Sequence, residues 1–188
     1  MTESVEIARN YLEQLSLAIS VFPTGDVIRV ANLLKENLGS GTLYTAGNGG
    51  SASTASHMAT DLGVGSLRRR NPLRVMSLVD NAAVLSATAN DLNFDLIFSE
   101  QLRLLARKGD YFICFSASGN SQNLINAVEE ARKLGTITIS ITGFDGGILR
   151  TLSDHNIHIE SENGSYGVVE DVHSTVSHLI TEIIRDPE

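Results

Sequence analysis

The sequence is poor in cysteine and tryptophan and has no long apolar run. Cys114 is the single cysteine among 188 residues, so an internal disulfide is impossible, and there is no tryptophan. No apolar stretch approaches the roughly 20 residues that a membrane-spanning helix requires. The first residues, MTESVEIARN, lack the positive region and the apolar core of a secretion signal. We therefore expect a cytoplasmic protein that does not associate with a membrane.

The sequence also lacks an excess of positive charge, low-complexity segments and internal repeats. Its net charge is −8 at pH 7, which argues against a general nucleic-acid-binding surface. The hydrophobic content of 42% and the charged content of 19% are typical of a soluble globular protein with a buried core. We expect residues 1–188 to form a single domain.

Two amphipathic helices are predicted ahead of the first strand. The first covers residues 4–22 and is ended by Pro23, and the second covers residues 26–38. Nothing before residue 40 is typical of a catalytic site. Residues 1–40 are therefore expected to cover the sheet or to bury their apolar stripes against another subunit, and we favour the second role for the first helix.

The rest of the chain alternates short strands with helices. The predicted strands are 42–46, 73–79, 111–115, 136–142 and 156–159. The predicted helices between and after them are 51–62, 82–89, 95–106, 121–134, 148–152 and 168–184. This alternation predicts an α/β fold, a three-layer α/β/α sandwich around a five-stranded parallel sheet. In such sheets ligands bind beyond the carboxyl ends of the strands.

One strand–turn–helix stretch is unusually rich in hydroxyl groups. The strand ending at Phe115 leads into the turn SASGNS, and the helix pattern begins directly afterwards. A helix N-terminus offers unpaired N–H groups and a positive dipole end, so this turn suits a phosphate or a similar anion. The alternative is an ordinary capped turn with Asn120 or Ser121 as the N-cap, and for one such turn alone we would favour it.

A second glycine-rich turn, Gly47–Ser51, repeats this arrangement after the strand 42–46. It is not a Walker A loop because no lysine follows, and no acidic residue at the right distance makes it a dinucleotide motif. Asn48 could hydrogen-bond a sugar hydroxyl; the alternative is a tight turn that needs positive φ. The loops at Asn48, Asn90 and Ser116–Ser121 all follow strands or lie beside them, so they are expected along one edge of the sheet. Arg68–Arg70 are expected in a solvated loop, with phosphate capture as the less favoured role.

Histidines and carboxylates recur on two predicted helices. His57 and Asp61 lie four residues apart and share a helix face, where they could chelate a metal, act as an acid–base pair or form a simple exposed ion pair. On the last helix, two histidines and two carboxylates fall within nine positions beside an apolar stripe: Glu170, Asp171, His173 and His178.

Taken together, these stretches resemble the sugar isomerase (SIS) domain family, of the phosphoheptose isomerase type. The resemblance covers nearly the whole chain and is carried by GNGGSASTASHMATDL, SATANDLNF, FSASGNSQNLINAVEEAR, TGFDGG and VEDVHSTVSHLI. It implies the SIS fold, a homotetramer with active sites shared between subunits, and a bound zinc. It also implies interconversion of sedoheptulose 7-phosphate with an aldoheptose phosphate, a step toward heptose-containing glycans.

The resemblance assigns roles to particular residues. The positions that match the family's substrate contacts, together with the adjoining Ser51, are Asn48, Gly49, Gly50, Ser51, Asn90, Asp91, Ser116, Ala117, Ser118 and Ser121. The zinc histidines fall on His57 and His178, and the two acidic positions, Asp61 and Glu170, complete a set of two histidines and two carboxylates. The family has Glu at position 61, Gln at 170 and usually Thr at 117. A shorter Asp61 and a new carboxylate at Glu170 mean either that the two acidic positions exchange roles or that the substrate differs.

The expected reaction is an aldose–ketose isomerisation through an enediol, giving D-glycero-D-manno-heptose 7-phosphate. It needs a carboxylate base and an acid or metal that stabilises the developing oxyanion. We expect Asp61 to be the base, with Glu170 as the rival, and His178 to be the acid and a zinc ligand. The rival class is a non-catalytic SIS tetramer that binds a replication-initiator protein or another protein partner. A phosphosugar-sensing regulator is less favoured because no segment is typical of a DNA-binding domain.

Overall fold

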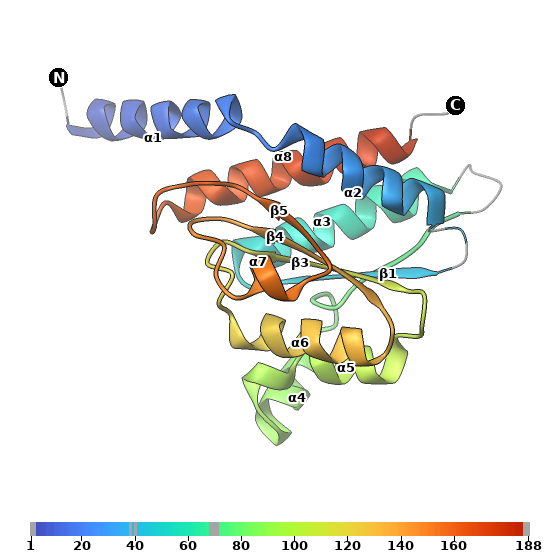
Figure 1. Cartoon of the computed structure of the whole chain (residues 1–188). Coiled ribbons are helices and arrows are strands. Elements are labelled where there is room, and N and C mark those ends of the chain that lie inside the picture. Colours follow the sequence, from blue (N-terminus) through green and yellow to red (C-terminus); the bar gives the residue numbers. More distant parts are fainter. Residues whose placement is uncertain (1–2, 38, 40, 68–71, 186–188) are drawn as a thin grey trace.

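The computed structural model describes residues 3–37, 39, 41–67 and 72–185, so the predicted Arg68–Arg70 loop lies outside the described residues. Its centre is a sheet of five parallel strands in the order β2-β1-β3-β4-β5 (Figure 1). The strands are β1 (Thr42–Gly47), β2 (Arg74–Ser77), β3 (Tyr111–Ser116), β4 (Ile137–Thr142) and β5 (His155–His158). The predicted α/β fold with a five-stranded parallel sheet is confirmed.

Helices cover both faces of this sheet and make it the middle layer of three (Figure 1). One layer holds α2 (Thr24–Asn37), α3 (Gly50–Gly65) and α8 (Tyr166–Arg185), with α1 (Glu3–Ser20) outside it. The opposite layer holds α4 (Ala82–Asp91), the 3-10 turn η1 (Phe94–Leu96), α5 (Ser99–Leu105), α6 (Gln122–Lys133) and α7 (Leu149–Leu152).

The central strand β3 divides its side chains between the two layers. Tyr111, Ile113 and Phe115 belong to the core under α3 and α8, while Phe112 and Cys114 belong to the core under α5 and α6. Every residue of β3 is buried, as expected for a parallel strand covered on both faces. The thiol of Cys114 is fully enclosed, and this burial raises its pKa to about 12.

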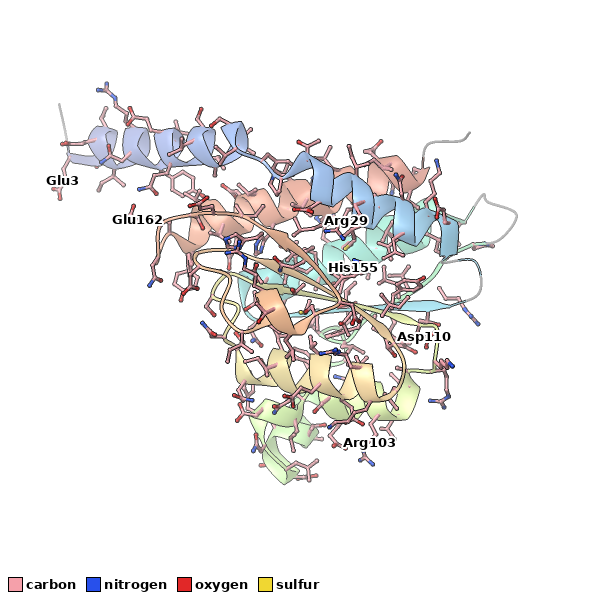
Figure 2. The ribbon with its side chains drawn as sticks, viewed as in Figure 1. Glu3, Arg29, Arg103, Asp110, His155 and Glu162 are labelled. Carbon is pink, nitrogen blue, oxygen red and sulfur yellow. The ribbon has the colours of Figure 1, made fainter. Side chains whose placement is uncertain are left out.

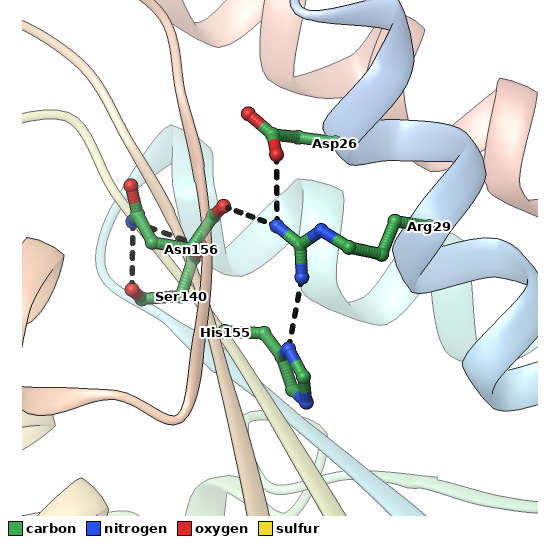
Figure 3. A network of polar contacts seen from close by, with 5 residues as sticks. All are labelled: Asp26, Arg29, Ser140, His155 and Asn156. Atoms are coloured by element: carbon green, nitrogen blue, oxygen red, sulfur yellow. Dashed lines mark hydrogen bonds and ion pairs between the residues drawn. The ribbon is translucent and has the colours of Figure 1, made fainter.

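A polar network fastens α2 to the edge strand β5. In Figure 3, Arg29 donates to Oδ1 of Asp26 at 2.8 Å, contacts Nδ1 of His155 at 2.9 Å and reaches the carbonyl of Asn156 at 3.5 Å. The amide of Asn156 in turn donates to the hydroxyl of Ser140 on β4 at 2.8 Å. Figure 2 shows Arg29 and His155 at this junction between the helix layer and the sheet.

Helix α1 makes little contact with the rest of its own chain. Ala18 is its one buried residue, whereas Ile7, Leu12 and Leu17 are each more than 60% exposed. Its shortest polar contact outside the helix is made by Tyr11, whose hydroxyl donates to Oδ2 of Asp171 on α8 at 2.6 Å, and Gln14 also accepts from the hydroxyl of Ser165 at 3.2 Å. That bond to a carboxylate raises the pKa of Tyr11 to about 12. The exposed stripe agrees with the predicted burial against another subunit, which stays a prediction.

The predicted elements differ from the structure at several boundaries: α3 continues to Gly65, beyond the predicted end at residue 62, and β2 ends at Ser77, before the predicted end at residue 79. The helix predicted over 95–106 is divided into η1 and α5, because the side chain of Asn93 accepts a hydrogen bond from the backbone N–H of Asp95 and forms a separate short turn. The last helix begins at Tyr166, two residues before the predicted start.

No single helix among the described residues is long and apolar enough to cross a membrane. Helices α1 and α2 reach such a length and composition only as a pair, and they are bent by 64° where they meet.

Candidate functional site

The two glycine-rich turns lie side by side at the carboxyl edge of the sheet. They follow β1 and β3, which are neighbours in the sheet, with Gly47 paired to Phe115. A side chain at Gly47 would place its Cβ 2.4 Å from the carbonyl oxygen of Ser51, so the first turn needs glycine there. Gly49 has a φ of 55°, in the left-handed region that glycine adopts readily. The two turns therefore lie together at one edge of the sheet, as predicted.

Three helix N-termini surround a cavity of about 140 Å³ between these turns. It is lined by Asn48, Ser51, Phe115, Ser116, Ala117, Ser118, Ser121, Tyr166 and Glu170. The helices α3, α6 and α8 all begin at this cavity. Hydroxyl groups and positive helix ends in one small space are suited to an anion.

The turn after β3 keeps the N-terminus of α6 open. Ser121 occupies the N-cap position, but its side chain makes no capping hydrogen bond. Asn120 is used elsewhere, because its amide donates to the carbonyl of Ser118 and accepts from the backbone N–H of Ile148. Neither residue therefore acts as the side-chain cap of the alternative interpretation, and the hydroxyl of Ser121 borders the cavity.

The carboxylate of Glu170 covers the start of α3. A Cβ at Gly50 would lie 2.2 Å from its Oε2 atom, so the two groups approach this closely only because position 50 is glycine. Next to a helix N-terminus a carboxylate is stabilised by the dipole. Glu170 is thus a negative group inside the serine-lined cavity.

His57, Asp61 and His178 form a separate cluster, where α3 and α8 run side by side. Oδ2 of Asp61 lies 3.4 Å from Nε2 of His57 and 4.0 Å from Nε2 of His178. The imidazole centroids are 5.0 Å apart and nearly perpendicular. One ligand atom from each of the three residues falls within 4.8 Å of the others, and both histidines are half exposed.

This cluster fits a zinc ion by the chemistry of its donors. Two imidazole nitrogens and one carboxylate oxygen are the protein ligands of many open zinc sites, in which a fourth position is left for water or substrate. The carbonyl oxygen of Asp61 also accepts a 2.7 Å hydrogen bond from Nη2 of Arg185, which fixes α3 against the end of α8.

Glu170 does not join these ligands within one chain. It precedes His178 by eight residues on α8, which is about 12 Å of helix rise. The structure therefore unites three of the four predicted metal ligands and places the fourth in the cavity. The two side chains are rotated by roughly 80° from each other around the helix, which suggested that both could reach one ligand, but the rise along the axis separates them.

The remaining predicted residues lie outside both groups. Asn90 and Asp91 end α4, are bonded to each other at 2.8 Å and do not line the cavity. His173 is fully buried on α8, 6.1 Å from the ring of Phe115, so it belongs to the core and not to the metal cluster. Burial lowers its pKa to about 4.

Asn123, in the first turn of α6, was missed by the sequence interpretation. Its carboxamide exchanges two 2.9 Å hydrogen bonds with that of Asn48, although it does not line the cavity. A second, more open groove of about 690 Å³ shares Asn48 with the cavity and follows α3 as far as His57. A polar residue just inside an otherwise apolar helix face was the available signal for Asn123.

Comparison with known proteins agrees with this geometry. The SIS domain family model matches residues 10–143, and the chain belongs to the SIS domain family. Its relatives include a probable phosphoheptose isomerase from Thermoplasma acidophilum, 34% identical over 95% of this chain and 98% of the relative. A phosphoheptose isomerase from Maridesulfovibrio salexigens is 32% identical over 96% of this chain and 83% of its own length.

Solved structures give the same result. A phosphoheptose isomerase from Francisella tularensis superposes with a TM-score of 0.87 at 25% identity, covering 98% of both chains. One from Neisseria gonorrhoeae superposes with a TM-score of 0.85 at 29% identity, covering 97% of this chain and 98% of the other. Within the family, this chain is thus similar to phosphoheptose isomerases in sequence and in structure.

Proposed function

We propose that the protein is an aldose–ketose isomerase that converts sedoheptulose 7-phosphate into D-glycero-D-manno-heptose 7-phosphate. The observation that carries this proposal is that helices α3 and α8, which bring His57, Asp61 and His178 together, also begin at a serine-lined cavity. The relatives named phosphoheptose isomerase support the choice of substrate. A pure binding module has no chemical need for this cluster.

The phosphate of the sugar would lie in the cavity. Ser116, Ser118 and Ser121 supply hydroxyl groups there, and the open N-terminus of α6 supplies backbone N–H groups. Ala117 presents only a methyl group and its backbone, so it shapes the loop without adding a hydroxyl. Gly49 and Gly50 allow the sugar to approach the first turn closely.

His57, Asp61 and His178 would hold the metal, for which zinc fits the donor set. When bound, it supplies a positive charge that polarises a sugar carbonyl. The identity of the metal is part of this proposal.

Proton transfer is assigned to the carboxylates and to His178. In the ketose-to-aldose direction, the base would take a proton from C1 and return it to C2. A proton would also move from the C1 oxygen to the C2 oxygen through the ring nitrogen of His178 that does not hold the metal. We assign the base to Asp61, with Glu170, whose carboxylate lines the cavity, as the rival. Asp61→Asn and Glu170→Gln keep the shape of each side chain. Because Asp61 is also a proposed metal ligand, the two variants are compared at equal zinc content, and the variant that loses proton transfer while zinc stays bound identifies the base.

We further propose a homotetramer whose active sites are shared between subunits, as the resemblance implies. The exposed apolar stripe of α1 supports burial against a second copy. The 12 Å of helix rise between Glu170 and His178 supports a ligand set that Glu170 completes only from a neighbouring chain.

Mixing two inactive variants tests this sharing. Ser118→Ala alters the cavity and His178→Ala alters the metal cluster, so co-assembly of the two restores intact sites only if a site combines the cavity of one chain with the cluster of another. Activity well above that of both parents is expected. Activity no greater than that of the parents would place each whole site in one chain.

The function itself is tested by turnover of C5 to C7 ketose phosphates by the purified protein, with and without a chelator. We expect the C7 substrate to be used best and the chelator to abolish conversion. Wild-type rates for Asp61→Asn, Glu170→Gln and His178→Ala together would refute the assigned chemistry. A metal-free protein that folds normally and converts none of the substrates would favour the non-catalytic binding protein.

A further inference from the structure

A closed pair of asparagine side chains connects the two turns of the cavity. Nδ2 of Asn48 donates to Oδ1 of Asn123, and Nδ2 of Asn123 donates to Oδ1 of Asn48, both at 2.9 Å. Asn123 is 2% exposed, so loss of its partner would leave a buried carboxamide without these two bonds. A carboxamide offers both a donor and an acceptor in one plane, which makes such a reciprocal pair possible.

The pair bridges elements that are far apart in sequence but adjacent in space. Asn48 lies in the turn that follows β1, and Asn123 lies in the first turn of α6, after β3. The cavity lies between the same two segments, with Ser51 on the side of Asn48 and Ser118 on the side of α6. The distance across the cavity therefore depends on the bond between the two amides.

We propose that Asn123 is a positioning residue that holds the two substrate-binding turns at their working separation through its paired amide with Asn48. This inference rests on the proposed function and deepens it. The pair uses one N–H and one lone pair of Asn48, which also lines the cavity, so Asn48 keeps a second N–H and a second lone pair for a sugar hydroxyl.

Loss of either amide should loosen the same connection. A displacement of about 1 Å in a positioned site can lower catalysis by roughly 100-fold. If Asn123 acts only through Asn48, its loss adds nothing once Asn48 has been removed, so the two effects do not multiply. If Asn123 acts independently of Asn48, the two effects multiply.

The test is a double-mutant cycle with Asn48→Ala, Asn123→Ala and the double variant. We expect each single change to lower kcat/KM for sedoheptulose 7-phosphate by about 10- to 100-fold, and the double change to lower it no further than the worse single change. Gln122→Ala is the matched control, because Gln122 is the neighbouring exposed residue of α6 and its side chain donates to Asn126 on the same helix at 2.8 Å. Its kcat/KM should stay within about threefold of wild type.

A second measurement does not depend on the activity. Amide hydrogen exchange of residues 47–51 should become faster in Asn123→Ala, although that change is made on the other side of the cavity. If Asn123→Ala does not fold, Asn123→Asp takes its place in both measurements. Asn123→Asp keeps the shape of the side chain and removes the hydrogen bond that Asn123 donates to Asn48. Multiplying effects on kcat/KM, or unchanged exchange at 47–51, would overturn the proposal. Absence of turnover in the wild-type protein would refute the proposed function, while the exchange measurement would still decide the role of Asn123.

Discussion

Acidification should destabilise the fold through His173. This residue lies on α8 with no exposed surface, and neither of its ring nitrogens has a hydrogen-bond partner among the described residues. Its surroundings include the ring of Phe115, the backbone of Thr142 and the imidazole of His158. Burial disfavours the charged ring and lowers the pKa of His173 from 6.5 to about 4.

The size of the effect follows from proton linkage. Below pH 6.5 the unfolded chain binds a proton at this histidine while the folded chain does not, so the free energy of unfolding falls as the pH falls. The loss continues until the folded pKa near 4 is reached. A shift of this size corresponds to about 3 kcal/mol, at 1.36 kcal/mol for each pH unit. Burial also lowers the pKa of His158, so this residue adds a smaller decrease in the free energy of unfolding as the pH falls.

The assay is urea unfolding of chelator-treated protein at a fixed concentration between pH 7.5 and pH 4. Other groups also titrate in this range, so the informative quantity is the difference between wild type and His173→Met. We expect the variant to be close to wild type or less stable at pH 7.5, and to gain about 3 kcal/mol relative to wild type by pH 4. A difference that does not change with pH would refute the account of a buried neutral imidazole.

Three further outcomes are expected. The hydrogen bond to Asp171 raises the pKa of Tyr11 to about 12. In an absorbance titration, Tyr11→Phe should therefore remove the tyrosine ionisation that occurs near pH 12. Gly50→Ala should displace the flexible carboxylate of Glu170 and lower turnover about tenfold or more, while the free energy of unfolding is kept or increased. Unchanged turnover would contradict the placement of that carboxylate. His178→Ala should weaken zinc binding at least tenfold in a calorimetric titration of the metal-free protein, and equal affinity would exclude this histidine as a ligand.

The sequence was sufficient for the architecture because its signals are local. Alternating strands and helices specify a parallel sheet, and such a sheet brings the turns after β1 and β3 to one edge. The spacing of His57 and Asp61 specified their shared helix face. The approach of His178 to that face required the resemblance, because no local rule places α8 beside α3.

What the sequence could not specify is the position of side chains in three dimensions. Glu170 and His178 are rotated by roughly 80° from each other around α8, and about 12 Å of rise places them at different sites. His173 was grouped with the polar residues of that helix and is buried in the core. The pairing of Asn48 with Asn123 depends on contact between turns that are 75 residues apart.

Proton NMR of the zinc-loaded protein with sedoheptulose 7-phosphate in D₂O tests the central claim most directly. We expect an aldoheptose phosphate to appear with deuterium at C2, because the carboxylate that carries the proton exchanges it with solvent before returning it. The ketose signals should persist unchanged with His178→Ala. A wild-type protein that holds one zinc per chain and leaves the ketose unchanged would contradict the claim.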